Sequence, residues 1–131
     1  MLLFEFDSEQ ITPEQLNNLE RYIDRLFASV GLDVNFTRHF KERLRDKRNG
    51  TPISVPELQR MFKKVHRQMR KGKDIIELGD EAQAVLKDLV SDINIPFVIN
   101  WDDSNKEFDL VAKTIMRKKN FWSGDDILPL N

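Results

Sequence analysis

Residues 95–116, IPFVINWDDSNKEFDLVAKTIM, are the stretch of sequence that decides the fold. Residues 95–101 and 108–116 are rich in β-branched and aromatic side chains, and the polar residues 102–105 between them have the composition of a turn. This pattern predicts a β-hairpin. Since the chain before residue 70 reads as helices, we expect the α+β class, with N-terminal helices packed on a C-terminal antiparallel β-sheet.

Three helices are predicted before this hairpin. The first starts at Thr12-Pro13-Glu14-Gln15, where a hydroxyl residue precedes a proline at the first helical position, and it stops at Gly31. The second begins between residues 33 and 37 and runs to about residue 48. The third starts at the capping box Ser54-Val55-Pro56-Glu57 and ends at residues 71–73.

The other segments have weaker patterns. Residues 75–78 are rich in strand formers and are predicted to be a strand, whereas residues 81–90 fit either a helix or a strand. Residues 2–6 could form a short strand. We expect one domain over residues 1–131, with a helical part at about 12–70, a sheet part at about 75–117 and a C-terminal tail at 121–131 that drapes over the surface.

The composition argues against several classes of protein. The chain of 131 residues has no cysteine, which rules out disulfides and thiolate metal sites and fits a reducing compartment. Its apolar runs are far shorter than the roughly 20 residues that span a bilayer. Its first residues lack the basic region of a signal peptide. We therefore expect a cytoplasmic protein that does not bind a membrane.

Charge is distributed very unevenly along the chain. Residues 38–73 hold thirteen Lys and Arg against three Asp and Glu, whereas residues 1–37 hold two against seven and residues 74–112 two against ten. The net charge of −1 therefore conceals a concentrated positive segment, which attracts polyanions. The same segment also fits solvated helix faces that acidic neighbours neutralise in the fold.

His39 and Arg43 are the first candidate site residues. Four residues apart on the predicted second helix, they border an apolar stripe of Phe36, Phe40 and Leu44, so both are expected where the helix meets the sheet. An imidazole can move protons near neutral pH and a guanidinium can hold a phosphate at two points, which together make half of a metal-independent site for cleaving phosphodiesters. Taken alone, the pair favours the plainer alternative of a boundary histidine beside an arginine paired with a carboxylate.

Thr114 and the residues after it form a second candidate group. On the predicted strand 108–116 the Thr114 hydroxyl precedes three cations, an arrangement suited to a phosphate but also typical of a solubilising strand end. His66 reads as an exposed or boundary residue. The cations predicted to contact nucleic acid are Arg45, Arg48, Lys63, Lys64, Arg67, Arg117, Lys118 and Lys119.

Other site chemistries have less support. No glycine-rich phosphate loop is present and the two histidines lie far apart in the chain, so we expect neither a cofactor nor a metal. The carboxylates of residues 102–109 could attract Mg²⁺, but a hairpin turn explains them better. Trp101 and Trp122 could stack on bases, although aromatic residues beside strands usually pack.

Two short motifs carry a family resemblance. His39-Phe40-Lys41-Glu42-Arg43, followed by Arg45, Arg48 and Ile53-Ser54-Val55-Pro56-Glu57-Leu58, resembles the H-x-x-x-R … I-S-x-x-E-L helical opening of small nucleases of the barnase/EndoU/colicin/RelE fold, including versions encoded by phages. The order of helices followed by a sheet that ends on a threonine-bearing strand is similar too. Residues 95–118 also resemble small proteins of tailed phages. The resemblance spans about residues 36–121.

The resemblance implies a metal-independent ribonuclease, in which the 2′-hydroxyl of RNA attacks its own phosphate. It implies that His39 is the acid/base residue, that Arg43 is a phosphate clamp and that Thr114 is a hydrogen-bonding residue on the sheet. We therefore predict a nucleic-acid-binding protein of phage type, with RNA as the favoured partner and RNA cleavage as its candidate reaction. The alternative is a non-catalytic phage protein that docks on an acidic host protein or acts in assembly, because a basic surface beside acidic segments suits such contacts.

Overall fold

The computed structural model describes residues 11–131, so the strand suggested at residues 2–6 lies outside the described residues. Its larger helices are α2 (Pro13–Phe27) and α4 (Val55–Gln68), and its shorter ones are α3 (Arg38–Arg43), α5 (Lys73–Ile76) and the turns η1 (Ala28–Val30), η2 (Lys47–Asn49) and η3 (Arg70–Gly72). The strands are β1 (Leu32–Phe36), β2 (Gln83–Asp88), β3 (Ile93–Asp102), β4 (Glu107–Ala112), β5 (Met116–Arg117) and β6 (Asp126–Leu130).

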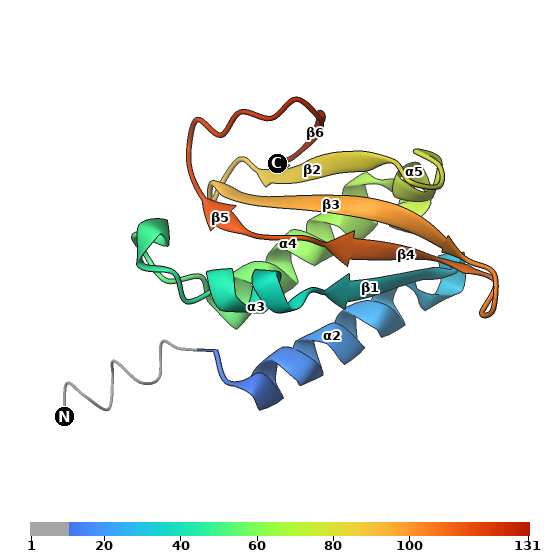
Figure 1. The fold of residues 1–131 in the computed structure, drawn as a ribbon, viewed down its shortest axis with the longest axis horizontal. Coiled ribbons are helices and arrows are strands. Elements are labelled where there is room, and N and C mark those ends of the chain that lie inside the picture. The colour runs from blue at the N-terminus through green and yellow to red at the C-terminus, as the bar shows by residue number, and fades with distance from the viewer. Residues whose placement is uncertain (1–10) are drawn as a thin grey trace.

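The strands form one mixed sheet in the order β1-β4-β3-β2-β6, with the short β5 paired to β3 (Figure 1). β3 is antiparallel to β2, β4 and β5, so the predicted hairpin and antiparallel pairing are correct for the central strands of the sheet. Both edge strands are parallel to their neighbours, β1 to β4 and β6 to β2. The predicted α+β class is confirmed, with a sheet that becomes mixed at its edges.

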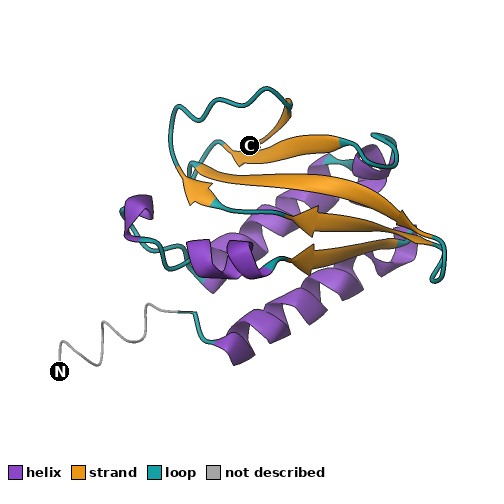
Figure 2. Ribbon diagram, in the orientation of Figure 1, coloured by secondary structure: helices purple, strands orange, loops and turns teal. Residues whose placement is uncertain are grey.

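Helices α2 and α4 pack against each other on one face of the sheet (Figure 2). Both begin as predicted, because Thr12 and Ser54 each accept a hydrogen bond from the N–H of the third helical residue, whose side chain bonds back to the cap. Helices and strands bury one hydrophobic cluster that includes Phe27, Phe62 and Phe97. Within residues 11–131, no helix combines the length and apolar character needed to cross a bilayer.

The second predicted helix is shorter than expected. Residues 32–36 form β1, and Thr37 then caps α3, which ends at Arg43. Phe36 therefore lies on a strand and not on the helical stripe assigned to it, although its ring stacks on that of Phe40 with centroids 4.4 Å apart. Alternating apolar residues at 32, 34 and 36 are a strand signal, but a segment this short also fits the start of a helix.

Two further segments differ from their predicted structure, and a third settles the choice between helix and strand. Residues 75–78 do not form the predicted strand, because Gly72 turns the chain with a φ of 98° and Ile75 enters the core from the single-turn helix α5. Residues 81–90 contain β2, whose alternate residues Ala84 and Leu86 face the core. The C-terminal tail forms β6 instead of draping over the surface, since Leu130 is buried in the same core.

Pro96 of β3 explains why Thr114 does not lie on a strand. The Lys113 N–H donates to the Pro96 carbonyl at 2.9 Å, but proline has no N–H to return the second bond, so the ladder between β3 and β4 ends at Ala112. The Lys113 carbonyl instead accepts the hydroxyl of Thr37 at 2.9 Å. Thr114 lies in the break between β4 and β5, which corrects the predicted strand 108–116.

Two carboxylates of α2 cover the outer edge of β1. The Val34 N–H donates to Asp24 at 2.9 Å, and the Phe36 N–H donates to Glu20 at 3.2 Å. These backbone donors point away from β4 and would otherwise be open to another strand. Burial raises the pKa of Asp24 to about 7; the bond from Val34 opposes the rise, and the nearby carboxyls of Asp33 and Glu20 add to it.

We expect the stability of the protein to depend on the protonation of Asp24. Because its pKa is raised in the folded state, the protonated form stabilises the fold below about pH 4, and this contribution is lost as the pH rises to about 7. Asp24→Asn keeps an acceptor for the Val34 N–H and removes the charge. The free energy of unfolding of the variant, measured in urea relative to wild type, should rise by about 1 kcal/mol between about pH 4 and about pH 8, a value reduced for solvent screening of this partly exposed group. A difference that does not change with pH contradicts this role of Asp24.

Candidate nucleic-acid site at one end of the sheet

Helix α3 and residues 113–117 are tied together at one end of the sheet (Figure 1). Thr37 makes the first tie, because its N–H donates to the carbonyl of residue 112 at 3.2 Å and its hydroxyl donates to that of residue 113. Asn49 makes the second, because its amide donates to the Arg43 carbonyl at 2.8 Å and its side-chain oxygen accepts the Arg117 N–H at 3.2 Å. The two segments that carry the predicted catalytic residues are therefore held next to each other.

The three predicted catalytic residues have different environments. His39 is exposed on α3, Arg43 lies one turn later and is half-buried, and Thr114 is half-buried in the break after β4. The structure therefore brings their segments together without a hydrogen bond between any two of these three side chains.

Arg43 Nε and Thr114 Oγ1 are the two buried side-chain polar atoms that lack a hydrogen-bond partner among the described residues. Asp46 Oδ2 lies 3.5 Å from Arg43 Nε, which brings the charges close without hydrogen-bond geometry. A buried polar atom without a partner costs free energy and calls for an explanation, such as a bound water or ion or a role in function. Both atoms are hydrogen-bond donors, but each is buried, so a phosphate oxygen reaches them only when the surrounding side chains move.

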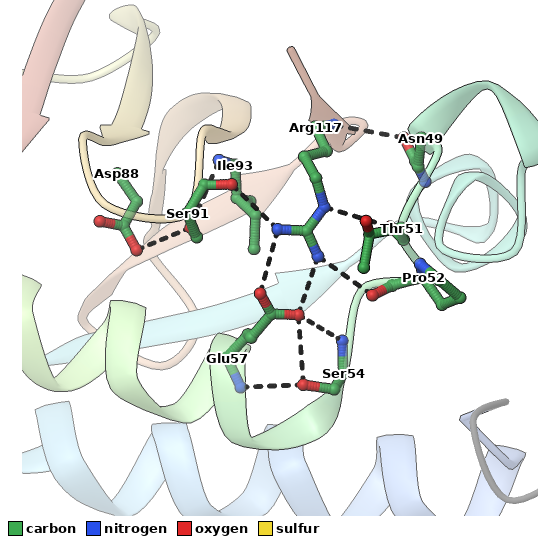
Figure 3. Close-up of polar contacts among 9 residues, drawn as sticks. All are labelled: Asn49, Thr51, Pro52, Ser54, Glu57, Asp88, Ser91, Ile93 and Arg117. Atoms are coloured by element: carbon green, nitrogen blue, oxygen red, sulfur yellow. Dashed lines mark hydrogen bonds and ion pairs between the residues drawn. The ribbon is translucent and has the colours of Figure 1, made fainter. Parts of the chain in front are cut away.

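Arg117 is an internal anchor and not the phosphate contact predicted for it. Its guanidinium donates to the two oxygens of Glu57 at 2.8 and 3.0 Å and to the backbone carbonyls of Thr51, Pro52 and Ser91 at 3.1, 3.0 and 2.9 Å (Figure 3). These five bonds use all five N–H donors of a guanidinium. The side chain is only 15% exposed, so no donor is left for a ligand and the prediction for Arg117 is corrected.

Glu57 serves both the start of α4 and the anchor. One of its oxygens accepts the Ser54 N–H that completes the capping box, and both oxygens bind Arg117. Burial opposes ionisation of Glu57, but the hydrogen bonds from Arg117 and Ser54 outweigh it and lower the pKa of the carboxyl. The pair is therefore fully charged at neutral pH.

Lys64 is a second internal cation. Its ammonium lies 2.8 Å from Asp88 Oδ1, and the Asp88 side chain is 4% exposed. Asp88 also accepts the Val90 N–H and the Ser91 hydroxyl. Burial opposes the charge on Asp88, but Lys64 and these bonds together lower its pKa. The predicted contact of Lys64 with nucleic acid is corrected, because the pair connects α4 to the turn between β2 and β3.

The remaining predicted contacts lie on the surface. Arg48 binds both oxygens of Asp46, at 2.7 and 3.1 Å, and its hydrogen bonds lower the pKa of that carboxyl. Arg45 donates to the Ile11 carbonyl at 2.6 Å. Among the other predicted contacts, Lys63, Arg67, Lys118 and Lys119 are exposed and form no ion pair with any residue of the described range 11–131.

A groove of about 420 Å³ lies between α2 and α3. Its lining includes Arg38, Lys41 and Arg45, of which Arg38 is paired with Glu42 and Lys41 with Glu20. None of the three predicted catalytic residues lines it, so the groove is separate from the candidate site.

Carboxylates gather at the opposite end of the sheet, on the face that α2 and α4 do not cover. Asp33 of β1 and Asp109 of β4 are register partners, and one carboxylate oxygen of each lies within 4.8 Å of one from Glu107. Burial and the charges of Asp33, Asp102 and Glu107 raise the pKa of Asp109. The sequence places Glu107 and Asp109 in one cluster but does not reveal Asp33, because β1 and β4 pair across a long stretch of chain.

The sequence also does not reveal the residues that hold the candidate site in place. Asn49 reads only as part of an Asn-Gly helix end, and Glu57 reads only as a capping residue. Their partner Arg117 is 68 and 60 positions away in the chain, respectively. Local patterns carry no signal for contacts of that kind.

Comparison with protein-family models, curated proteins and solved structures finds no match to this chain. Only the geometry of the chain itself therefore bears on its function.

We expect Arg117→Lys to lower the free energy of unfolding by about 2 kcal/mol, because an ammonium cannot satisfy two carboxylate oxygens and three carbonyls at once. Urea denaturation measures the change. Arg48→Lys is the matched control, since it alters an arginine–carboxylate pair on the exposed surface and should change stability little. Equal effects of the two substitutions would contradict the anchoring role of Arg117.

Proposed function

We propose that this protein binds RNA at the end of the sheet formed by α3 and residues 113–119, and that it cleaves the RNA without a metal. The observation that carries the proposal is the pair of buried donors without partners, Arg43 Nε and Thr114 Oγ1, on two segments that hydrogen bonds tie together. His39 lies one helical turn from Arg43 on an exposed part of α3, accessible to a substrate. This is the activity implied by the resemblance to nucleases of the barnase/EndoU/colicin/RelE fold.

The distribution of charge supports a polyanion as the ligand. Lys118 and Lys119 are exposed at the same end of the sheet as α3, since the Lys118 N–H bonds to the carbonyl of Asp92 just before β3. The cluster of Asp33, Glu107 and Asp109 lies at the other end. A protein with this polarity attracts a phosphate backbone to one end and repels it from the other.

In the proposed reaction the neutral imidazole of His39 accepts the proton of the 2′-hydroxyl, and O2′ attacks the adjacent phosphorus. The bond between phosphorus and O5′ breaks, and the leaving oxygen takes a proton from water. The products are a 2′,3′-cyclic phosphate and a 5′-hydroxyl end. Arg43 and Thr114 stabilise the negative charge that develops on the phosphoryl oxygens, where positioned donors contribute most.

A second candidate function is docking of an acidic protein on the same basic end, without catalysis. The observation that favours it is the turn between β2 and β3, where the side chains of Leu89 and Val90 are exposed next to the cations. Exposed apolar side chains rimmed by charge are common in protein interfaces. The two measurements below separate this function from RNA binding.

We expect the protein to cleave single-stranded RNA in the presence of EDTA and to leave cyclic phosphate ends. His39→Ala should reduce the rate about 100-fold or more, because general base catalysis contributes about 10²–10⁴-fold. His66→Gln is the matched control, since His66 of α4 packs edge to face with Phe27 of α2. Gel analysis of end-labelled RNA, with a 2′-deoxy substrate as a blank, measures the rate. No cleavage by wild type, or equal cleavage by His39→Ala, would remove the catalytic part of the proposal.

We expect RNA affinity to fall steeply with salt, with a log–log slope of about −0.7 for each phosphate contact on a single strand. Combining Lys118→Ala with Lys119→Ala should make that slope shallower by about 1.4. Lys106→Ala is the matched control, because Lys106 is exposed at the β3–β4 turn and paired with Asp103. Fluorescence anisotropy of labelled RNA over a salt series gives the slopes. No measurable binding at low salt would favour the protein-docking function.

A further inference from the structure

Trp122 lies almost entirely in solvent. Its side chain is 82% exposed, on the segment 118–125 between β5 and β6. Trp101, the other tryptophan, packs its ring edge against Phe108 with centroids 4.8 Å apart. The general expectation that aromatic residues beside strands pack therefore holds for Trp101 and fails for Trp122. An indole that stays in solvent contributes no burial energy to the fold, and its ring face is open to a ligand.

The segment before Trp122 is held firmly. The side-chain amide of Asn94, which is fully buried, donates to the Lys118 carbonyl at 2.9 Å, and the ammonium of Lys87 donates to the Lys119 carbonyl at 3.0 Å. The Lys118 N–H donates to the Asp92 carbonyl at 2.9 Å. Asn94 and Lys87 are register partners on β3 and β2, so these bonds fix the segment on the sheet itself. Trp122 thus follows a segment whose backbone is fixed by hydrogen bonds.

The charges around Trp122 differ on its two sides. Lys118 and Lys119 are exposed before it, and Asp125 and Asp126 follow it at the start of β6. The Cα atoms of Lys119 and Trp122 are at most about 10 Å apart, since the two residues are three positions apart in the chain. A phosphate backbone on the lysines therefore has a base within reach of the indole, and the carboxylates direct the strand away from β6.

We propose that Trp122 is a stacking platform for an unpaired nucleobase, so that this site selects single-stranded RNA over duplex RNA. The inference rests on the proposed RNA-binding function and adds the substrate class. A base can lie on an aromatic ring only when it is free of its own helix, whereas lysines bind the backbone of either form. Trp122 therefore distinguishes single-stranded from duplex RNA, and Lys118 and Lys119 attract the phosphate backbone of both.

The test uses the full chain, a fluorescein-labelled 12-nucleotide uridine-rich RNA and a duplex of the same length, both with 2′-O-methyl groups that the proposed reaction cannot cleave. Anisotropy gives the affinity for each. Trp122→Ala should weaken binding of the single strand about tenfold, the effect typical of losing one stacked base, and leave the duplex unchanged. Trp122→Phe, which keeps an aromatic face, should retain most of the affinity. Trp122→Leu, which is apolar without such a face, should resemble Trp122→Ala.

A second readout isolates the indole. Trp101→Phe leaves Trp122 as the single tryptophan, and its fluorescence should be quenched when unlabelled single-stranded RNA binds. Binding by anisotropy without quenching, or equal affinity of wild type and Trp122→Ala for the single strand, overturns the stacking role and leaves the RNA-binding function intact. No binding of either RNA by wild type overturns both and assigns Trp122 to a protein interface.

Discussion

The ion pair between Arg117 and Glu57 is the interaction on which the arrangement of the candidate site depends. The loop at residues 51–52, the start of α4, the turn at Ser91 and strand β5 all meet on one guanidinium. Carbonyls in irregular segments have no ladder or helix to bond them, and a forked side chain with five donors satisfies three of them here. Strand β5 has only two residues, so Arg117 contributes more than strand pairing to fixing the path from Thr114 to Lys119. Arg117, which the sequence predicts as a contact for nucleic acid, thus stabilises the fold.

The candidate site is built from interruptions of regular structure. Because Pro96 has no N–H, the hydrogen-bond ladder between β3 and β4 stops, and the Lys113 carbonyl accepts a hydrogen bond from the Thr37 hydroxyl instead. Thr114 comes directly after this point, and Arg43 lies on the short helix that Thr37 begins. The two donors without partners, Arg43 Nε and Thr114 Oγ1, therefore lie at the end of the sheet that adjoins α3. The carboxylates of Asp33, Glu107 and Asp109 lie at the other end.

The parts of the fold that depend on neighbours in sequence could be predicted, and the parts that depend on distant partners could not. The caps at Thr12 and Ser54 and the hairpin after Pro96 follow from local patterns. Strand β1 overlaps the predicted start of the second helix, between residues 33 and 37, because its pairing with β4 is invisible to periodicity. Thr114 is predicted on a strand because the missing donor of Pro96 acts across the sheet. Among the site residues, His39 and Arg43 share a helix face as expected, whereas Lys64 and Arg117 could not be recognised as internal without their partners Asp88 and Glu57.

The parallel pairing at both margins of the sheet also bears on how the chain folds. β2, β3 and β4 are consecutive and can form a meander from local contacts, but β1 pairs with β4 and β6 with β2 only after large loops have closed. Closing such loops costs chain entropy before the contacts form, which makes these pairings late events. We therefore expect the meander to form before the two outer strands pair, and we expect these strands to open more readily than the meander in the native state. Because α3 follows β1 directly, local opening at that margin also loosens the helix that carries His39.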